Sequence, residues 1–273
     1  QGCDASVFLD DSNGDRRHCI ERDAIPHMTL KGFDKINMIK EELEQVCPVI
    51  SCADTTALAT RDGIVLAGGP FYPVFTGRRD SLRSYFEEDS AKEKPSVFWV
   101  LTCSTTFSLI SWGHNIGKIG CEFIRARLYN FSGTGQLDPS IASDFLEQIG
   151  RSCPLNKSSN SDGSPALMRS RVMSESTLGM GDNEELSSSI SSRACFDTHI
   201  YQSLLRGRGL LFSDQQLMVD DQTAMLVRIY SIGNGSTFQM DFARVMVKLS
   251  NLGALTGSEG RVRINCSRLA SSS

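Results

Sequence analysis

Apolar residues at helical spacing predict most of the regular structure of this chain. Residues 33–46 carry Phe, Ile, Leu and Val at this spacing, so we expect an amphipathic helix there, with Lys40, Glu41 and Glu44 on its outward face. Four further helices are expected: one after Cys52, one starting at Asp138-Pro139, one from Asp197 to a stop at Gly207 and Gly209, and one spanning Phe238 to Leu249. Few segments alternate like strands, so the fold class is mainly α.

Composition agrees with one ordinary globular domain. The 273 residues are 40% hydrophobic and 22% charged, and the formal net charge of -4 gives no basic surface for nucleic acid or an acidic membrane. The apolar runs are too short to cross a bilayer. Residues 156–192 are rich in Ser, Asn and Gly and predict a long irregular surface excursion within a single domain over 1–273.

The nine cysteines are spread along the chain without C-x-x-C pairs, which favours disulfides in an oxidising compartment over a zinc ribbon. Four sequons, beginning at Asn130, Asn156, Asn234 and Asn265, fit a secreted glycoprotein. The chain starts at Gln1 without a signal sequence. We therefore expect a fragment whose signal peptide is removed or lies upstream.

One of the four histidines stands in an unusual setting, in "SWGHNIGKIGC" at 111–121. Taken alone, His114 would be read as a capping or packing residue. Gly113 and Gly117, however, remove side chains on either side of it, and Ile116, Phe123 and Ile124 offer apolar walls. A haem fits this pattern, because it needs one axial imidazole and a flat apolar slot.

Six segments together carry a resemblance to the secreted plant (class III) haem peroxidases. They are "GCDASVFLDD" at 2–11, "CPVISCAD" at 47–54, "GGPFYPVFTGRRDS" at 68–81, "SWGHNIGKIGCEFIRARLYNF" at 111–131, "FDTHIYQSLLRGRGLLFSDQQL" at 196–217 and "GSEGRVRINC" at 257–266. They stand in the family's order over nearly the whole chain. The resemblance implies the plant peroxidase fold, with two helical lobes around a haem cleft, and peroxide-dependent oxidation of phenolic donors.

By this resemblance His114 is the axial ligand of a haem b iron, and Gly117, Phe123 and Ser213 adjoin the haem. Asp214 then accepts the hydrogen of the His114 Nδ1, which fixes the tautomer and makes the imidazole a stronger donor to iron. From the residues alone, Ser213-Asp214 would instead be read as a helix N-cap.

The resemblance also implies two disulfides, Cys121 with Cys153 and Cys52 with Cys266. Cys3 and Cys47 have family partners that would precede Gln1. The remaining cysteines, Cys19, Cys103 and Cys195, have no counterpart in the family.

Two calcium sites are implied, both incomplete. Gly2, Asp4 and Ser6 match ligands of the family's distal site, with Glu21 linked to that calcium through water, although Glu21 alone reads as a surface charge. Asn115, Ser192 and Asp197 match the proximal site, together with Ser189. The neutral serines are expected to lower its affinity for Ca²⁺.

The family's distal His and Arg, which assist peroxide cleavage, would precede "GCDAS", so this helix is expected to be absent and activity impaired. His27 stands where the family commonly has an Asn and is expected to be inert. Pro95 resembles a proline at the entrance for aromatic substrates, although the stretch that follows it, 97–110, departs from the family.

Two functions therefore remain open. One is a monomeric, secreted haem peroxidase of the cell wall or vacuole, which acts on hydrogen peroxide and small phenols. The other is a secreted, inactive remnant that binds haem weakly or not at all. A calcium-binding module explains fewer residues than either.

Overall fold

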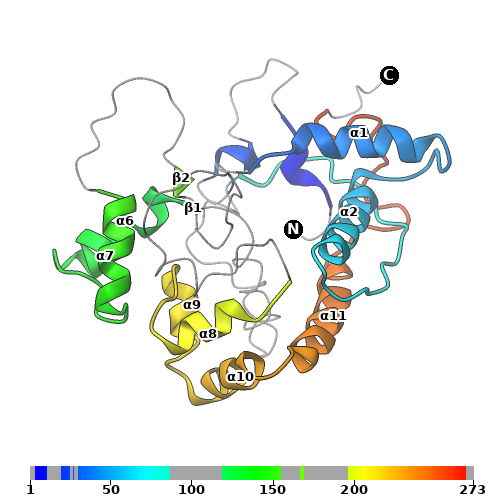
Figure 1. Cartoon of the computed structure of the whole chain (residues 1–273). Helices are drawn as coiled ribbons and strands as arrows, with labels where there is room; N and C mark the ends of the chain where they lie inside the picture. Colours follow the sequence, from blue (N-terminus) through cyan, green and yellow to red (C-terminus); the bar gives the residue numbers. More distant parts are fainter. Residues whose placement is uncertain are drawn as a thin grey trace, which may run out of the picture. The chain divides into compact units, whose positions relative to one another are not determined.

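The computed structural model describes residues 4–10, 20–24, 27, 30–86, 119–154, 167–168 and 196–268 (Figure 1). These residues are mainly helical, as expected, and their only strands are β1 (Ile119–Gly120) and β2 (Leu167–Met168), which pair antiparallel. The chain divides into two compact units. We call them unit 1 (Gln1–Trp99 with Phe242–Ser273) and unit 2 (Val100–Asp241). Residues 156–192 lie outside the described residues apart from β2, so the expected surface excursion and single domain stay predictions.

Unit 1 contains α1 (Phe33–Glu44), α2 (Cys52–Leu66) and the later part of α11 (Ser236–Ser250). The helix expected after Cys52 is confirmed. It begins there because the Ser51 side chain accepts a hydrogen bond of 2.9 Å from the Asp54 backbone N–H, which satisfies one of the free donors of the first turn. The Cys52–Cys266 disulfide and Ala5, Phe8 and Ala53 form a buried core beside it.

The outward face predicted for α1 is wrong at Lys40. Its side chain is only 1% exposed and pairs with Glu44 one turn later, whereas Val46, predicted to pack, is 88% exposed beyond the end of the helix. A lysine stem is long and apolar and can be buried when a carboxylate meets its ammonium group. The periodicity therefore located the helix but misplaced part of its buried face.

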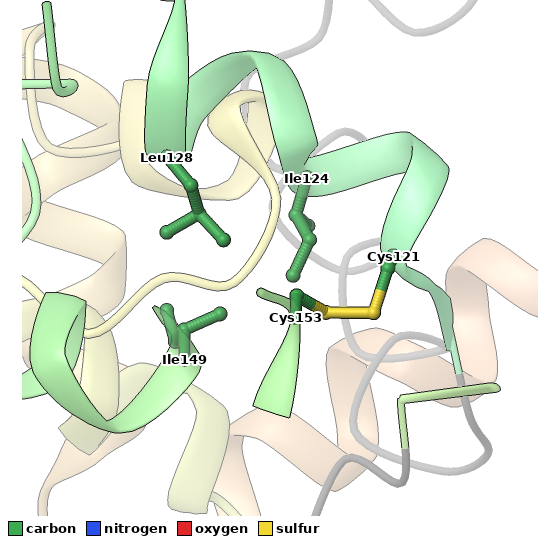
Figure 2. Close-up of a cluster of buried hydrophobic side chains, with 5 residues drawn as sticks. All are labelled: Cys121, Ile124, Leu128, Ile149 and Cys153. Carbon is green, nitrogen blue, oxygen red and sulfur yellow. A yellow bond between two sulfur atoms is a disulfide. The ribbon is translucent and has the colours of Figure 1, made fainter. Parts of the chain in front are cut away.

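Unit 2 contains the remaining described helices: α6 (Cys121–Tyr129), α7 (Ser143–Ser152), α8 (His199–Leu205), α9 (Phe212–Gln216), α10 (Asp221–Ser231) and the start of α11. Figure 2 shows Ile124 and Leu128 of α6 pointing toward Ile149 of α7, beside the Cys121–Cys153 disulfide. α8 ends as predicted, since Gly207 takes a positive φ of 69° that favours glycine.

The start predicted for α7 is also wrong. The helix begins at Ser143, because Asp138 is engaged elsewhere: its carboxylate is fully buried and lies 2.7 Å from the Nε of Arg127. The Asp138-Pro139 pair belongs to a turn that precedes the helix, in which Asp138 is buried and Pro139 is exposed.

Candidate functional site

Asp214 lies in the first turn of α9 and is 2% exposed. The N-cap interpretation of this residue is wrong, because the cap position of α9 is Leu211, which makes no side-chain cap. Burial raises the pKa of the Tyr201 hydroxyl above its usual range, and the nearby Tyr230 and Asp214 raise it further. Asp214 is therefore a buried carboxylate that acts electrostatically on Tyr201.

The turn that leads into α9 is held by Arg127 of α6. Its Nη1 donates to the carbonyl oxygens of Gly209 and Leu210 at 2.7 and 2.8 Å, while its Nε donates to Asp138 at 2.7 Å. Its Nη2 lies 3.3 Å from the Ser140 hydroxyl. We call Arg127, Asp138 and Ser140 the α6 clamp. Because the clamp fixes the backbone just before α9, it fixes where this helix starts and therefore where Asp214 lies.

Gln215 holds the same turn from the other side. Its Oε1 accepts from the Gly209 N–H at 2.9 Å and its Nε2 donates to the Leu204 carbonyl at 3.2 Å. A Cβ at Gly209 would lie 2.8 Å from the Gln215 Oε1 and the Leu204 Cδ2, so a larger residue there would displace the Gln215 amide from its hydrogen bond. The loop before Asp214 is thus fixed by side-chain bonds to its backbone.

The other residues expected at the haem are only partly described. His114 and Gly117 lie outside the described residues. Phe123 is half-buried on α6, Ser213 is exposed on α9, and Ile124 packs in the core between α6 and α7 (Figure 2), so the apolar walls of the slot stay a prediction.

Asp197 is the described member of the expected proximal calcium set. Its Oδ1 accepts from the His199 backbone N–H at 3.0 Å, and its Oδ2 lies 3.8 Å from the His199 ring. Asn115, Ser189 and Ser192 lie outside the described residues, so this calcium site stays a prediction.

The described residues of the expected distal calcium site line one cavity in unit 1. Asp4, Ser6 and Glu21 face a space of about 250 Å³ whose other walls are mostly apolar side chains of α2 and α11. Asp4 is 2% exposed and Glu21 is 8% exposed. The Glu21 Oε2 has no hydrogen-bond partner among the described residues, and a buried carboxylate oxygen in that state favours a cation. This fits Ca²⁺ and contradicts the interpretation of Glu21 as a surface charge. Gly2 lies outside the described residues.

Distant residues hold the loop that carries Asp4 and Ser6. The Asp4 carbonyl accepts from the Ser81 N–H at 2.8 Å, and the Ala5 carbonyl accepts from the Arg263 guanidinium. Ala5 has a positive φ of 58°, which is unfavourable for a residue with a Cβ. We call Ser81 and Arg263 the loop anchors, since they maintain this backbone shape.

His27 has a structural partner. Its Nδ1 lies 2.9 Å from the Glu21 carbonyl oxygen, to which it donates. The ring is thereby oriented by the segment that carries Glu21. This agrees with the expectation that His27 is inert, which stays a prediction. Pro95 and the altered stretch 97–110 lie outside the described residues.

Buried arginines were missed by the sequence interpretation. Arg127, Arg263 and Arg78 are each 4% exposed or less, and each donates to backbone carbonyl groups of another segment. Arg78 also pairs with Asp54 at 3.0 Å. Periodicity does not distinguish such arginines from surface charges, because Arg125 and Arg127 both stand between apolar residues of α6, yet Arg125 is exposed and Arg127 is buried.

Two further kinds of site are absent from the described residues. No helix among them is long and apolar enough to cross a membrane. No group of three or more His, Cys, Asp or Glu side chains that could hold a metal ion was found in the same residues. A calcium ion at the Asp4 loop therefore needs further oxygen ligands from hydroxyl groups, backbone carbonyls or water.

The sequence is similar to known proteins over nearly its whole length. The family model described as "Peroxidase" matches residues 1–232. Putative Peroxidase 48 of Arabidopsis thaliana is 39% identical over 292 residues, which cover 98% of this chain and 71% of that protein. Peroxidase 10 of the same plant is 38% identical, over 97% of this chain and 72% of its own length. Peroxidase N1 of Nicotiana tabacum is 36% identical, over 98% and 76% respectively.

Proposed function

The chain belongs to the peroxidase family, whose members are oxidoreductases that act on hydrogen peroxide, and we propose that it is a haem peroxidase that oxidises small phenolic donors. The observation that best supports this is Asp214. It is a buried carboxylate on a short helix whose backbone is fixed by the α6 clamp and Gln215, so it is preorganised to hold another polar group.

In this proposal His114 binds the iron and donates its Nδ1 hydrogen to Asp214. Gly117, Phe123 and Ser213 adjoin the haem, and Pro95 lies at the donor entrance. The haem supplies the redox chemistry with peroxide when it is bound. The task of Asp214 is to keep the imidazole in one tautomer and orientation, and burial suits it because no water competes for that proton.

We also propose that Ca²⁺ binds the Asp4 loop through Gly2, Asp4 and Ser6, with Glu21 nearby. The unpartnered Glu21 Oε2 and the two buried carboxylates support this fit. Asn115, Ser192 and Asp197 form the weaker second site. A polypeptide of these 273 residues alone is proposed to react slowly with peroxide, because it contains no distal His and Arg of the family kind to move the proton and stabilise the charge.

The proposed setting is extracellular. The disulfides Cys52–Cys266 and Cys121–Cys153 are the pairs that the resemblance implies, and structural disulfides persist in oxidising compartments. With the four sequons, they support a secreted monomeric glycoprotein of the cell wall or vacuole. Its proposed partners are peroxide and small phenols.

Reconstitution with haem tests the proposal. We expect the wild-type chain to show a Soret band at one haem per chain, and His114→Ala to lose it. His27→Ala is the matched control and is expected to keep the band, since His27 binds a backbone carbonyl in unit 1. An unchanged Soret band in His114→Ala would overturn the assignment of the ligand.

A further inference from the structure

Three helices of unit 2 meet in a cluster of buried aromatic rings. Tyr201 of α8, Tyr230 of α10 and Phe238 of α11 are each 1% exposed or less. The ring centroids lie 5.3 Å apart for Tyr201–Tyr230, 5.3 Å for Tyr201–Phe238 and 5.8 Å for Tyr230–Phe238. Phe196 stacks on Phe238 at 5.1 Å. Such tight packing explains the rings as a core, but it leaves open what the two hydroxyl groups do.

The Tyr230 hydroxyl donates a hydrogen bond of 3.0 Å to the Oδ2 of Asp241, which is partly exposed on α11. A carboxylate in hydrogen-bond contact is a ready proton acceptor, and its contact with solvent lets the proton leave. The second hydroxyl, on Tyr201, is influenced electrostatically by both Tyr230 and Asp214, and the rings of Tyr201 and Tyr230 are in contact. The cluster therefore connects the surroundings of Asp214 with a proton exit at Asp241.

We propose that Tyr230 is a redox-active tyrosine, oxidised by way of Tyr201 while its phenolic proton passes to Asp241. This rests on the proposed function, which supplies the oxidant. In the step, the Tyr230 O–H bond breaks, one electron leaves toward the haem site and the proton joins the Asp241 carboxylate, so that a neutral tyrosyl radical remains. Hydrogen peroxide is the terminal oxidant and becomes water. Reduction of one hydrogen peroxide molecule to water takes two electrons: Tyr230 supplies one of them, and a phenolic donor supplies the other.

Tyr230 is chosen because the Asp241 carboxylate can accept its phenolic proton. A phenol that loses an electron becomes strongly acidic, so oxidation is easy only where a base takes the proton at the same time. Tyr129 offers a matched contrast in the same unit, because its hydroxyl donates to the backbone carbonyl of Cys153 at 2.6 Å, and a carbonyl is a very weak base. Burial of both rings of the Tyr201–Tyr230 pair also shields a radical from solvent reductants.

The first test uses the haem-loaded chain, with loading checked by the Soret band. After mixing with one equivalent of peroxide and freeze-quenching, electron paramagnetic resonance is expected to show a tyrosyl signal. Tyr230→Phe should remove most of it, and Tyr129→Phe should leave it unchanged. Asp241→Asn should slow its formation by ~10² or more, the usual range for loss of a positioned base. A signal that survives undiminished in Tyr230→Phe overturns the proposal.

A second test separates this proposal from the proposed function. If the chain takes up no haem, a photoexcited ruthenium polypyridyl complex with persulfate supplies a one-electron oxidant to the haem-free protein. We expect the oxidised protein to carry its radical on Tyr230. The tyrosyl signal should therefore again fall in Tyr230→Phe and persist in Tyr129→Phe. Loss of the signal in Tyr129→Phe instead would place the radical there and refute the role of Tyr230. Thermal unfolding of each variant shows that the helices remain packed.

Discussion

The Asp4 loop of unit 1 and the Asp214 turn of unit 2 are built in the same way but completed differently. In each, a buried arginine donates to the carbonyl groups of the loop and lies near a buried aspartate, Arg263 with Asp80 and Arg127 with Asp138. In unit 2 the Nε and both Nη atoms of Arg127 have partners. In unit 1 the Arg263 Nε and Nη1, like the Glu21 Oε2, make no hydrogen bond among the described residues, and the Nε only approaches the Asp80 Oδ2 at 3.9 Å.

This difference indicates which region depends on a ligand. The Asp214 turn satisfies its polar groups with protein atoms, so it can hold its shape before any cofactor binds. Beside the Asp4 loop, the Glu21 Oε2 borders a cavity and has no hydrogen-bond partner among the described residues, and a buried polar group in that state costs about 1–3 kcal/mol. We therefore expect unit 2 to be preorganised and unit 1 to be completed by a cation.

The two disulfides provide the largest expected effect. Cys52–Cys266 closes a separation of 214 residues, and Cys121–Cys153 closes one of 32. The chain-entropy model gives about 5 kcal/mol for the first and about 4 kcal/mol for the second. Cys52→Ser with Cys266→Ser should thus lower the free energy of unfolding more than Cys121→Ser with Cys153→Ser in urea titrations. Cys47→Ser is the control, since that thiol is free and exposed. Equal losses for both pairs would contradict the model.

Arg127→Met is expected to cost about 3–5 kcal/mol, because it leaves the fully buried Asp138 without its cation. Hydrogen exchange should accelerate at Gly209 to Asp214, the backbone that the clamp holds. Arg125→Met is the matched control, because Arg125 is an exposed arginine on the same helix. If exchange in this turn is unaffected by Arg127→Met, the clamp does not position Asp214.

Calcium should act on unit 1 with a smaller effect. At a concentration a hundredfold above its Kd, a ligand specific for the native state stabilises by about 2.7 kcal/mol. The stabilisation by Ca²⁺ should appear as slower hydrogen exchange in residues 4–10 and should be lost in Glu21→Gln. Glu259→Gln, an exposed carboxylate of unit 1, should retain it. Protection that appears equally in Glu21→Gln would show that Glu21 does not take part.

The smallest expected effect is a difference in pH dependence. Burial alone would raise the pKa of Asp138, but hydrogen bonds from Ser140 and Arg127 outweigh it and lower the pKa. Its stabilisation is therefore present above the unfolded pKa of ~3.9 and is lost as the pH falls through the lower folded value. For Asp80, burial outweighs the hydrogen bonds from Arg263, Ala53 and Cys52 and raises the pKa. Its contribution is present below ~3.9 and is lost as the pH rises through the higher folded value.

Acidification from pH 6 should thus first strengthen unit 1 at Asp80 and then, below ~4, weaken unit 2 at Asp138. Hydrogen exchange of α2 and α6, corrected for the intrinsic pH dependence of exchange, measures the two units separately. In Asp138→Asn the loss below ~4 should be reduced, whereas the exposed Asp221→Asn should behave as wild type. Loss of protection in α2 before α6 would reverse the expected order.

The sequence by itself determined where most described helices lie. Periodic apolar residues located α1, and glycine ended α8, because these signals act within a few residues. The family resemblance supplied the two disulfide pairs and drew attention to Asp214. It did so through motifs spread over nearly the whole chain, not through any local property of those residues.

Only the tertiary structure decided which charged residues are buried. Lys40 looks like a surface charge, Asp138 like a helix start and Arg127 like an exposed arginine, yet all three are buried. Their partners include Glu44, one turn away, and the carbonyl of Gly209, 82 residues away. A buried charge is tolerated only where a partner meets it, and for contacts between distant segments that partner is defined only when the chain has folded.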